Sequence, residues 1–234
     1  QQYFSRNTPI RLEVSENNIV SIELDNQAKG IITKITETSI TLKEEDGLTY
    51  SYRLNDPTII IYDDKSNSWD ELKVGDRVEI SLSSDRKEAE VIRLTQTFIL
   101  RAHIIDEEDK EILFIDDEGG MEELEIEKDV PIIVAGSDAA DLSDIPLHDP
   151  LAVTLTGDRV DAVEVLSVKR GIITKVNGSS RTLTFLPYGK SSAEEITFEN
   201  PMQIYKGFKL YTSPTILNVN DRVEIAEDSA GNKY

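Results

Sequence analysis

The chain is 234 residues long, more than one small domain needs, and its formal net charge is −20 at pH 7. This charge argues against nucleic-acid binding, which requires a basic face, and it argues equally against binding to anionic membrane surfaces. The chain has no cysteine and therefore no disulfide, and no stretch approaches the roughly 18 apolar residues of a membrane span.

A seven-residue sequence occurs twice and organises the chain. Lys29–Ile35 reads Lys-Gly-Ile-Ile-Thr-Lys-Ile, and Arg170–Val176 reads Arg-Gly-Ile-Ile-Thr-Lys-Val. The interval between the copies holds two units of about 70 residues, so a third copy is expected between them. The repeat predicts a tandem array of small β modules.

Residues 1–25 are predicted to be the closing hairpin of a preceding module. Thr8–Val14 and Ile19–Leu24 both alternate apolar and polar residues, and a short polar turn separates them. We expect that the chain was cut from a longer array. The alternative is that neighbouring modules share strands.

The first complete module spans residues 26–94 and defines the order of elements. A strand containing Gly30 is followed by a return strand, a third strand after the Asp46-Gly47 turn, an apolar strand, one helical turn and a closing hairpin. The uninterrupted apolar run predicts a strand buried on both faces. In order, these elements are Gly30–Ile35, Thr38–Lys43, Leu48–Leu54, Thr58–Tyr62, Trp69–Leu72 and the hairpin Asp76–Leu94.

The second module, residues 95–168, keeps this order with a weaker motif. Phe98–Ile105 takes the place of the glycine-containing strand but has lost the glycine, and the Gly75-Asp76 junction of the first module is also missing. Asp141–Ile145 is predicted to be its helical turn.

The third module, residues 169–234, repeats the order again. It ends in Asn220–Ile225, a near copy of Gly75–Ile80, and we expect it to lack its last strand.

The predicted fold class is all-β, a tandem array of β-barrel or half-open sandwich modules of about 70 residues, each with a single short helical turn. Closure is expected because five or six short strands bury too little surface to leave open edges. Gly30 is expected either at a barrel corner, where a strand bends sharply, or in a plain turn.

The order of these motifs resembles a known bacterial family. Gly-Ile-Ile-Thr-Lys, an Asp-Gly turn, a helical turn and Leu-Lys-Val-Gly-Asp-Arg-Val-Glu-Ile are similar to small β-barrel modules of unknown function, which occur in tandem in secreted and cell-surface proteins, often beside S-layer homology domains. Residues 29–82 and 170–225 carry the resemblance. It implies an extracytoplasmic location and a structural or adhesive role, and it brings no catalytic residues. The absence of cysteine fits the cell surface or cell wall of a Gram-positive bacterium.

The sequence contains no recognisable catalytic motif. It has no Gly-x-Ser-x-Gly, phosphate-binding loop or His-Glu-x-x-His, and nothing singles out one of its many carboxylate pairs. The two histidines, His103 and His148, lie far apart in the sequence without a further strong ligand nearby, so they do not indicate a zinc site. We expect no enzymatic activity.

Negative charge is concentrated in the second module. Residues 95–168 contain 20 Asp and Glu but 4 Lys and Arg, so they carry −16 of the net −20. Such carboxylates indicate either a solvated surface or a calcium site, and otherwise no cofactor is expected. The candidate calcium ligands are Asp106, Asp109, Asp116, Glu118, Asp138, Asp141 and Asp144.

Aromatic residues offer a second possible ligand surface. They could stack on sugars of a cell-wall glycan, or they could pack within the modules, with Trp69 closing a barrel end. They are Tyr50, Tyr52, Tyr62 and Trp69 in the first module and Tyr205, Phe208 and Tyr211 in the third.

We therefore expect a non-enzymatic extracellular repeat segment of a bacterial surface or S-layer-associated protein. It would act as a spacer, assembly or adhesion element that contacts neighbouring modules, cell-wall polymer or other surface proteins. The alternative is a ligand-binding module for calcium or cell-wall glycan.

Overall fold

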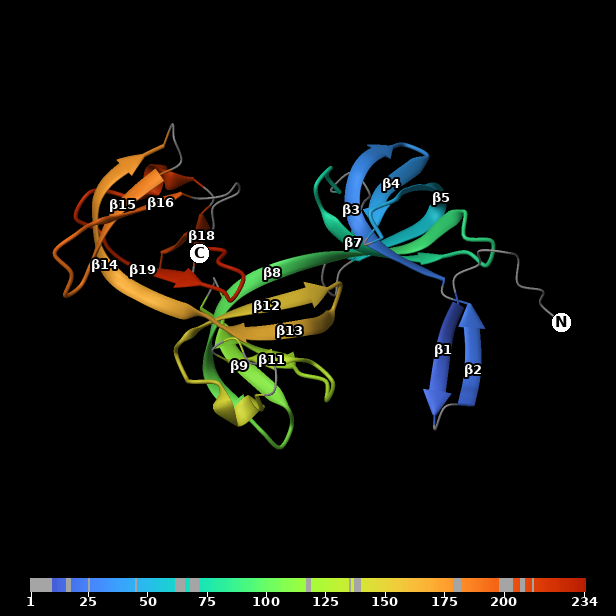
Figure 1. Cartoon of the computed structure of the whole chain (residues 1–234), viewed down its shortest axis with the longest axis horizontal. Helices are drawn as coiled ribbons and strands as arrows, with labels where there is room; N and C mark the ends of the chain where they lie inside the picture. Colours follow the sequence, from blue (N-terminus) through green and yellow to red (C-terminus); the bar gives the residue numbers. More distant parts are fainter. Residues whose placement is uncertain are drawn as a thin grey trace. The chain divides into compact units, whose positions relative to one another are not determined.

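The structure is a computed structural model, and it describes residues 10–15, 18–24, 26–44, 46–61, 66–67, 72–116, 119–134, 136, 140–178, 182–197, 204–206, 209–211 and 213–234. Over these residues the regular elements are β-strands and two 3-10 turns (Figure 1). The predicted all-β class is confirmed. No helix within the described ranges has the length and apolar character needed to cross a membrane.

The chain forms two compact units. The first comprises residues 1–96 and 155–159, and the second comprises residues 97–154 and 160–234. The strands of the first unit are β1 (Ile10–Ser15), β2 (Asn18–Leu24), β3 (Gln27–Thr36), β4 (Ser39–Glu44), β5 (Thr49–Ile61), β6 (Ser66–Asn67), β7 (Arg77–Leu82) and the first half of β8 (Glu88–Asp106).

β1 and β2 pair as the antiparallel hairpin that the sequence predicts, with Ile10 opposite Leu24. Within the described residues they form a two-stranded sheet of their own.

Five strands of the first unit close into a barrel. β3 pairs with β4 and β7, β4 with β5, and β7 with β8, all antiparallel. A parallel pairing between β5 and β8, with Ile60 opposite Ile92, closes the ring. This is the arrangement of the five-stranded barrels called OB-folds. The interior is formed by Ala28, Ile32, Ile40, Leu42, Tyr52, Ile60, Leu72, Val78, Ile80, Leu82, Ala89, Ile92 and Leu94.

A β-bulge changes which residues of β3 face the core. Simple alternation predicts Ile31, Thr33 and Ile35 on one face. The register shifts between Ile32 and Lys34, so Ile32 is buried and Ile35 also packs against the core, while Ile31 is exposed. The predicted faces of β3 are therefore wrong after Thr33, because a bulge inserts one residue and inverts the alternation.

The prediction of a strand buried on both faces is wrong as well. Residues 49–61 form one strand, β5, with an irregularity between Leu54 and Ile59. Ile60 is buried, but Ile59 is 50% exposed, because a strand of a small barrel has one face inside and one outside. The predicted helical turn Trp69–Leu72 lies outside the described residues except for Leu72, which is buried.

Gly30 lies in the middle of β3, between Glu44 on β4 and Val78 on β7, and not in a turn. A Cβ atom at Gly30 would come within 2.4 Å of the Lys43 carbonyl oxygen. The glycine therefore permits a close approach of two strands.

The second unit repeats this topology in the second module. β9 pairs with β8 and β10, β12 lies between β8 and β13, and β11 is parallel to β13. A 3-10 turn, η2 (Leu142–Asp144), lies where the sequence predicts a helical turn. The strands are β9 (Glu111–Ile115), β10 (Met121–Glu125), β11 (Ile132–Ile133), β12 (Pro150–Thr156) and β13 (Arg159–Val165).

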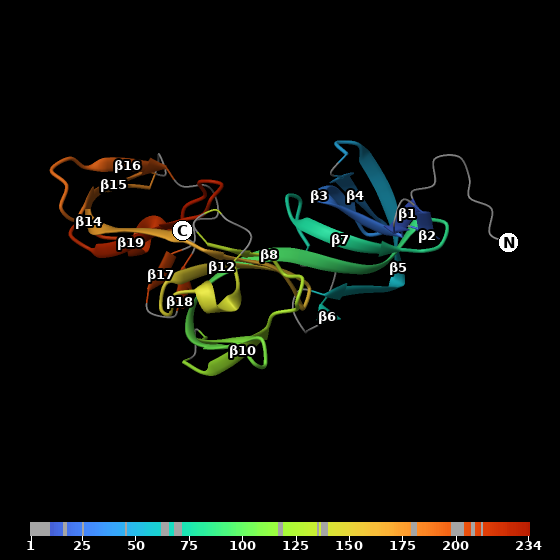
Figure 2. The same cartoon turned by 60° about the horizontal axis from the view of Figure 1, so that its bottom comes forward.

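The third module forms a four-stranded sheet in the order β16-β15-β14-β19 (Figure 2). Its core contains Ile173, Leu183, Phe185, Ile196 and Ile225. Its elements are β14 (Ser167–Asn177), β15 (Thr182–Pro187), β16 (Glu194–Thr197), the hairpin of β17 (Ile204–Lys206) and β18 (Lys209–Tyr211), the turn η3 (Pro214–Ile216) and β19 (Arg222–Glu227).

Candidate functional site

The basic residue of the repeated motif lies directly opposite a glutamate in two modules. Lys29 on β3 pairs with Glu79 on β7, and Arg170 on β14 pairs with Glu224 on β19. The Nζ–Oε2 and Nε–Oε1 distances of these ion pairs are both 2.9 Å. The recurrence of Lys/Arg-Gly therefore reflects a cross-strand ion pair between the first and fourth strands of a module.

Glu79 is the most enclosed of these carboxylates, with its side chain 3% exposed. Arg159, the first residue of β13, also contacts it, with Nη2 3.3 Å from Oε2. Burial raises the pKa of Glu79, but the hydrogen bond from Lys29 and the charges of Lys29 and Arg159 lower it, and the net direction is down. The two cations hold this carboxylate ionised inside the unit.

The lowered pKa predicts a pH-dependent contribution of Glu79 to stability. A carboxyl with a lower pKa in the folded state stabilises fully above its unfolded pKa, about 4.3, and loses this contribution as the pH falls through the folded pKa. We expect the difference in free energy of unfolding between the wild type and Glu79→Gln to be constant near neutrality and to shrink below about pH 4. Urea titrations at several pH values measure it, and a difference that grows on acidification would contradict the assignment.

Glu224 has two arginine partners in the second unit. Arg101 on β8 lies 2.6 Å from its Oε2 and also donates a hydrogen bond of 2.6 Å to the carbonyl oxygen of His148. The hydrogen bond from Arg170, followed by the contacts with Arg101, lowers the pKa of Glu224. Arg101 thus links the second module to the third.

The second module replaces the ion pair with apolar residues. The bulge of the second module falls between Ala102 and Ile104. At the same distance before the bulge, Ile99 occupies the position that Lys29 holds in the first module. Ala152 occupies the position of Glu79 on the fourth strand. Both belong to an apolar cluster with Leu166, Ala226 and Tyr234. An ion pair is therefore not essential to the module at this position.

The turn before the fourth strand recurs in all three modules, although the sequence suggested that the second had lost it. His148 takes the place of Gly75, and its φ of 67° lies in the left-handed region, as do those of Gly75 at 105° and Asn220 at 76°. The His148-Asp149 pair thus replaces the Gly75-Asp76 junction. The substitution hid the equivalence because histidine signals this conformation much less strongly than glycine does.

The predicted calcium ligands lie in separate turns. Asp106 accepts the N–H groups of Glu108 and Asp109, each at 3.0 Å, so it stabilises the turn between β8 and β9. Asp116 accepts the N–H of Gly120 at 2.6 Å.

Asp144 accepts the N–H of Asp141, the residue that caps the start of η2, at 2.9 Å. Glu118 and Asp138 lie outside the described residues. The residues that the structure does describe include no group of three or more His, Asp or Glu arranged to hold a metal. Calcium binding stays a prediction.

Carboxylates crowd the outer face of the β9–β10 hairpin. Glu111 lies opposite Glu125, with Asp106 opposite it on β8. Desolvation and the charges of Glu123, Asp109, Asp106 and Glu125 raise the pKa of Glu111. This face thus carries unbalanced negative charge.

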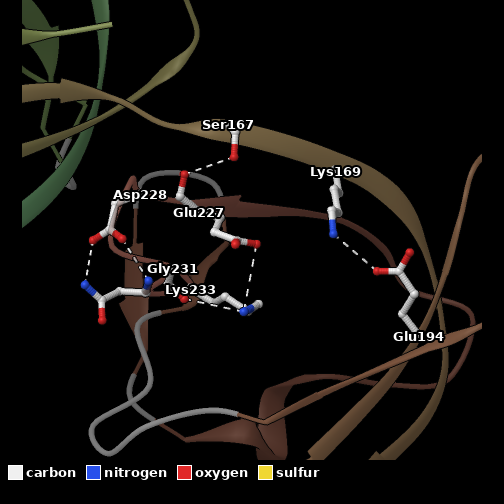
Figure 3. A network of polar contacts seen from close by, with 8 residues as sticks. Ser167, Lys169, Glu194, Glu227, Asp228, Gly231 and Lys233 are labelled. Atoms are coloured by element: carbon white, nitrogen blue, oxygen red, sulfur yellow. Dashed lines mark hydrogen bonds and ion pairs between the residues drawn. The ribbon is translucent and has the colours of Figure 1, made fainter. Parts of the chain in front are cut away.

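The chain beyond β19 folds back in a polar loop (Figure 3). Asp228 accepts hydrogen bonds from the backbone and side-chain nitrogens of Asn232, at 2.8 and 2.7 Å. Lys233 then pairs with Glu227 in a β-bridge and lies 3.8 Å from its carboxylate. A hydrogen bond from Ser167 to the Glu227 carbonyl and an ion pair between Lys169 and Glu194 complete the drawn contacts.

Three of the candidate aromatic residues, Tyr50, Tyr52 and Tyr205, make structural contacts. Tyr52 is buried in the first barrel and donates a hydrogen bond to Glu44, and burial together with this bond raises its pKa. Tyr50 lies on the same face at the rim, bonded to Asp46 at 3.3 Å. The hydroxyl of Tyr205 accepts the N–H of Ile99 at 3.3 Å. The side chains of Tyr62, Trp69 and Phe208 lie outside the described residues.

Comparisons with known proteins add little to these observations. No family model and no curated protein matches the chain. A solved structure described as "drosophila Unr CSD456" is 14% identical and covers 86% of this chain and 89% of that chain, with a TM-score of 0.23. A TM-score this low carries no argument about fold or function.

Proposed function

We propose that the chain is a non-enzymatic repeat segment of a bacterial cell-surface protein, which acts as a spacer, assembly or adhesion element. The observation that carries this proposal is that the recurring residues hold the first and third modules together. Gly30 and Gly171 permit close strand contacts, and the glutamates opposite the neighbouring Lys29 and Arg170 form ion pairs. This recurrence is expected if the repeated residues are kept because they stabilise the module, and not because they carry out a shared reaction.

The joins between modules support the same reading. β8 is one strand of 19 residues that pairs with β7 in the first module and with β9 in the second. β13 ends at Val165 and β14 begins at Ser167, so a single residue separates the second module from the third. Modules that follow one another without a linker suit a spacer.

The second and third modules also share a mixed interface. The apolar cluster of Ile99, Ala152, Leu166, Ala226 and Tyr234 draws on both modules. Polar contacts lie beside it, among them a hydrogen bond of 2.6 Å from the Ser229 N–H to Glu164. Such contacts favour an array whose neighbouring modules bind each other.

The location of the protein in its cell tests the proposal. Intact cells are treated with a protease, and the segment is then detected with an antibody against it. We expect the digestion to remove the antibody signal, because the segment would be exposed at the cell surface. A signal peptide and S-layer homology repeats encoded by the same gene would support the proposal further. Protection of the segment until the cells are lysed, or an operon shared with a cytosolic partner, would contradict it.

The alternative is a module that binds calcium or cell-wall glycan. It is favoured by the carboxylates around Glu111, whose pKa is raised by desolvation and by the neighbouring negative charges. Calcium binding at the acidic turns requires a melting temperature that rises in millimolar calcium and falls again with chelator. An unchanged melting temperature would leave only the glycan, which a cell-wall pulldown tests.

A further inference from the structure

The two histidines of the chain occupy two positions that are neighbours in every module. The first is the bulge residue of the first strand, and the second is the left-handed residue before the fourth strand. In each module the N–H of the left-handed residue donates to the carbonyl of the residue before the bulge, at 2.8 Å, 3.0 Å and 2.8 Å. The two positions hold Thr33 and Gly75 in the first module, His103 and His148 in the second, and Thr174 and Asn220 in the third.

The second module therefore brings two imidazoles together from residues far apart in the sequence. Their ring centres lie 5.6 Å apart, with an angle of 60° between the ring planes. Both side chains are exposed, so either ring can turn a nitrogen toward a common ion.

The backbone of His148 is fixed on both sides. Its N–H donates to Ala102 at 3.0 Å, and its carbonyl accepts from Arg101 at 2.6 Å. A non-glycine residue in the left-handed region is strained, and a glycine at this position would avoid the strain. Strain of this kind is retained at functional positions more often than elsewhere.

The spacing of the rings suits a shared metal ion. Metal–nitrogen bonds are about 2.0–2.1 Å long, so two imidazoles bound to one tetrahedral ion have ring centres about 5–6 Å apart. The Arg101 guanidinium lies beside His148, and its positive charge, which would repel a metal ion, is balanced by Glu224 at 2.6 Å. The second module as a whole is acidic, which favours the binding of cations.

We propose that His103 and His148 form a surface site for a divalent transition-metal ion of the Zn²⁺, Ni²⁺ and Cu²⁺ class. Imidazole suits these ions, whereas Ca²⁺ requires oxygen ligands. Two protein ligands leave the remaining positions to water or to a group from a partner. The site would join the first strand of the second module to its fourth.

Zinc titration of tag-free protein, followed by the ¹⁵N signals of the imidazoles, tests the site. The chain has two histidines, so these signals report on this pair alone. Both rings should shift together and saturate at one ion per chain, and the melting temperature should rise. Calcium at the same concentration should leave both rings unchanged.

His103→Thr and His148→Asn are matched variants, because Thr174 and Asn220 occupy these positions in the third module. Each variant should fold and lose zinc affinity by at least about tenfold, since the chelate is broken. The two substitutions can also be combined in one protein. Zinc binding that persists in this double variant would assign the ion to carboxylates and overturn the proposal. A shift of one ring that does not depend on the other histidine would overturn it as well.

Discussion

Replacing Gly171 with alanine should unfold the third module at urea concentrations that leave the first module intact. A Cβ atom at this position would lie 2.2 Å from the Leu186 carbonyl oxygen and 2.6 Å from the Phe185 ring. The oxygen belongs to the paired strand β15 and the ring to the core, so neither moves without loss of structure. We expect a loss of about 3 kcal/mol or more in the free energy of unfolding of this module.

Gly178→Ala is the matched control, because its Cβ would meet only Pro214, at 4.0 Å, and the effect should be within about 0.5 kcal/mol. Amide NMR signals followed through a urea titration separate the modules, whose unfolding need not be a single two-state transition. Equal stability of Gly171→Ala and Gly178→Ala would contradict the close-approach explanation.

The second module shows why its glycine could be lost. By the register of the bulge, Leu100 occupies the position of Gly30 and Gly171. In the first and third modules the return strand reaches this position, with Glu44 opposite Gly30 and Pro187 opposite Gly171. In the second module the pairing of β8 with β9 stops at Ala102 opposite Phe114, so no residue of this return strand is paired with Leu100. Glycine is needed only where a paired return strand crosses it.

The repeat, the hairpins and the all-β class could be predicted because alternation, turn residues and self-similarity are local signals. The bulges could not be predicted, because a threonine such as Thr33 does not distinguish a bulge from an ordinary strand position. One consequence was the wrong assignment of Ile35, and another was that His103 was not seen to be equivalent to Thr33.

The candidate site could be predicted in part. Lys29 and Glu79 recur as Arg170 and Glu224 at matching positions of the repeat. The sequence therefore contains a sign that the two residues form a pair. The contribution of Arg159 could not be predicted, because this residue, at the start of β13, is far from Glu79 in the sequence and meets it only in the folded first unit. The proximity of His103 and His148 likewise depends on the strand order, which brings the first and fourth strands together.

The second prediction concerns the ion pair itself, because the protein contains both versions of it. Lys29→Ile leaves Glu79 buried with Arg159 as its remaining partner, at 3.3 Å. Lys29 is 50% exposed, so part of its attraction is screened, and we expect a loss of about 1–3 kcal/mol in the free energy of unfolding.

Adding Glu79→Ala should recover most of that loss, although it removes a second partner of the network. The double variant copies Ile99 and Ala152 of the second module and no longer buries a charge, and replacing a buried ion pair by apolar residues is often neutral. Arg170→Ile is the matched control, since Glu224 is 35% exposed and keeps Arg101 at 2.6 Å, and it should destabilise the protein less than Lys29→Ile does. A double variant less stable than Lys29→Ile alone would mean that the Glu79 carboxylate stabilises the barrel through contacts other than the ion pair.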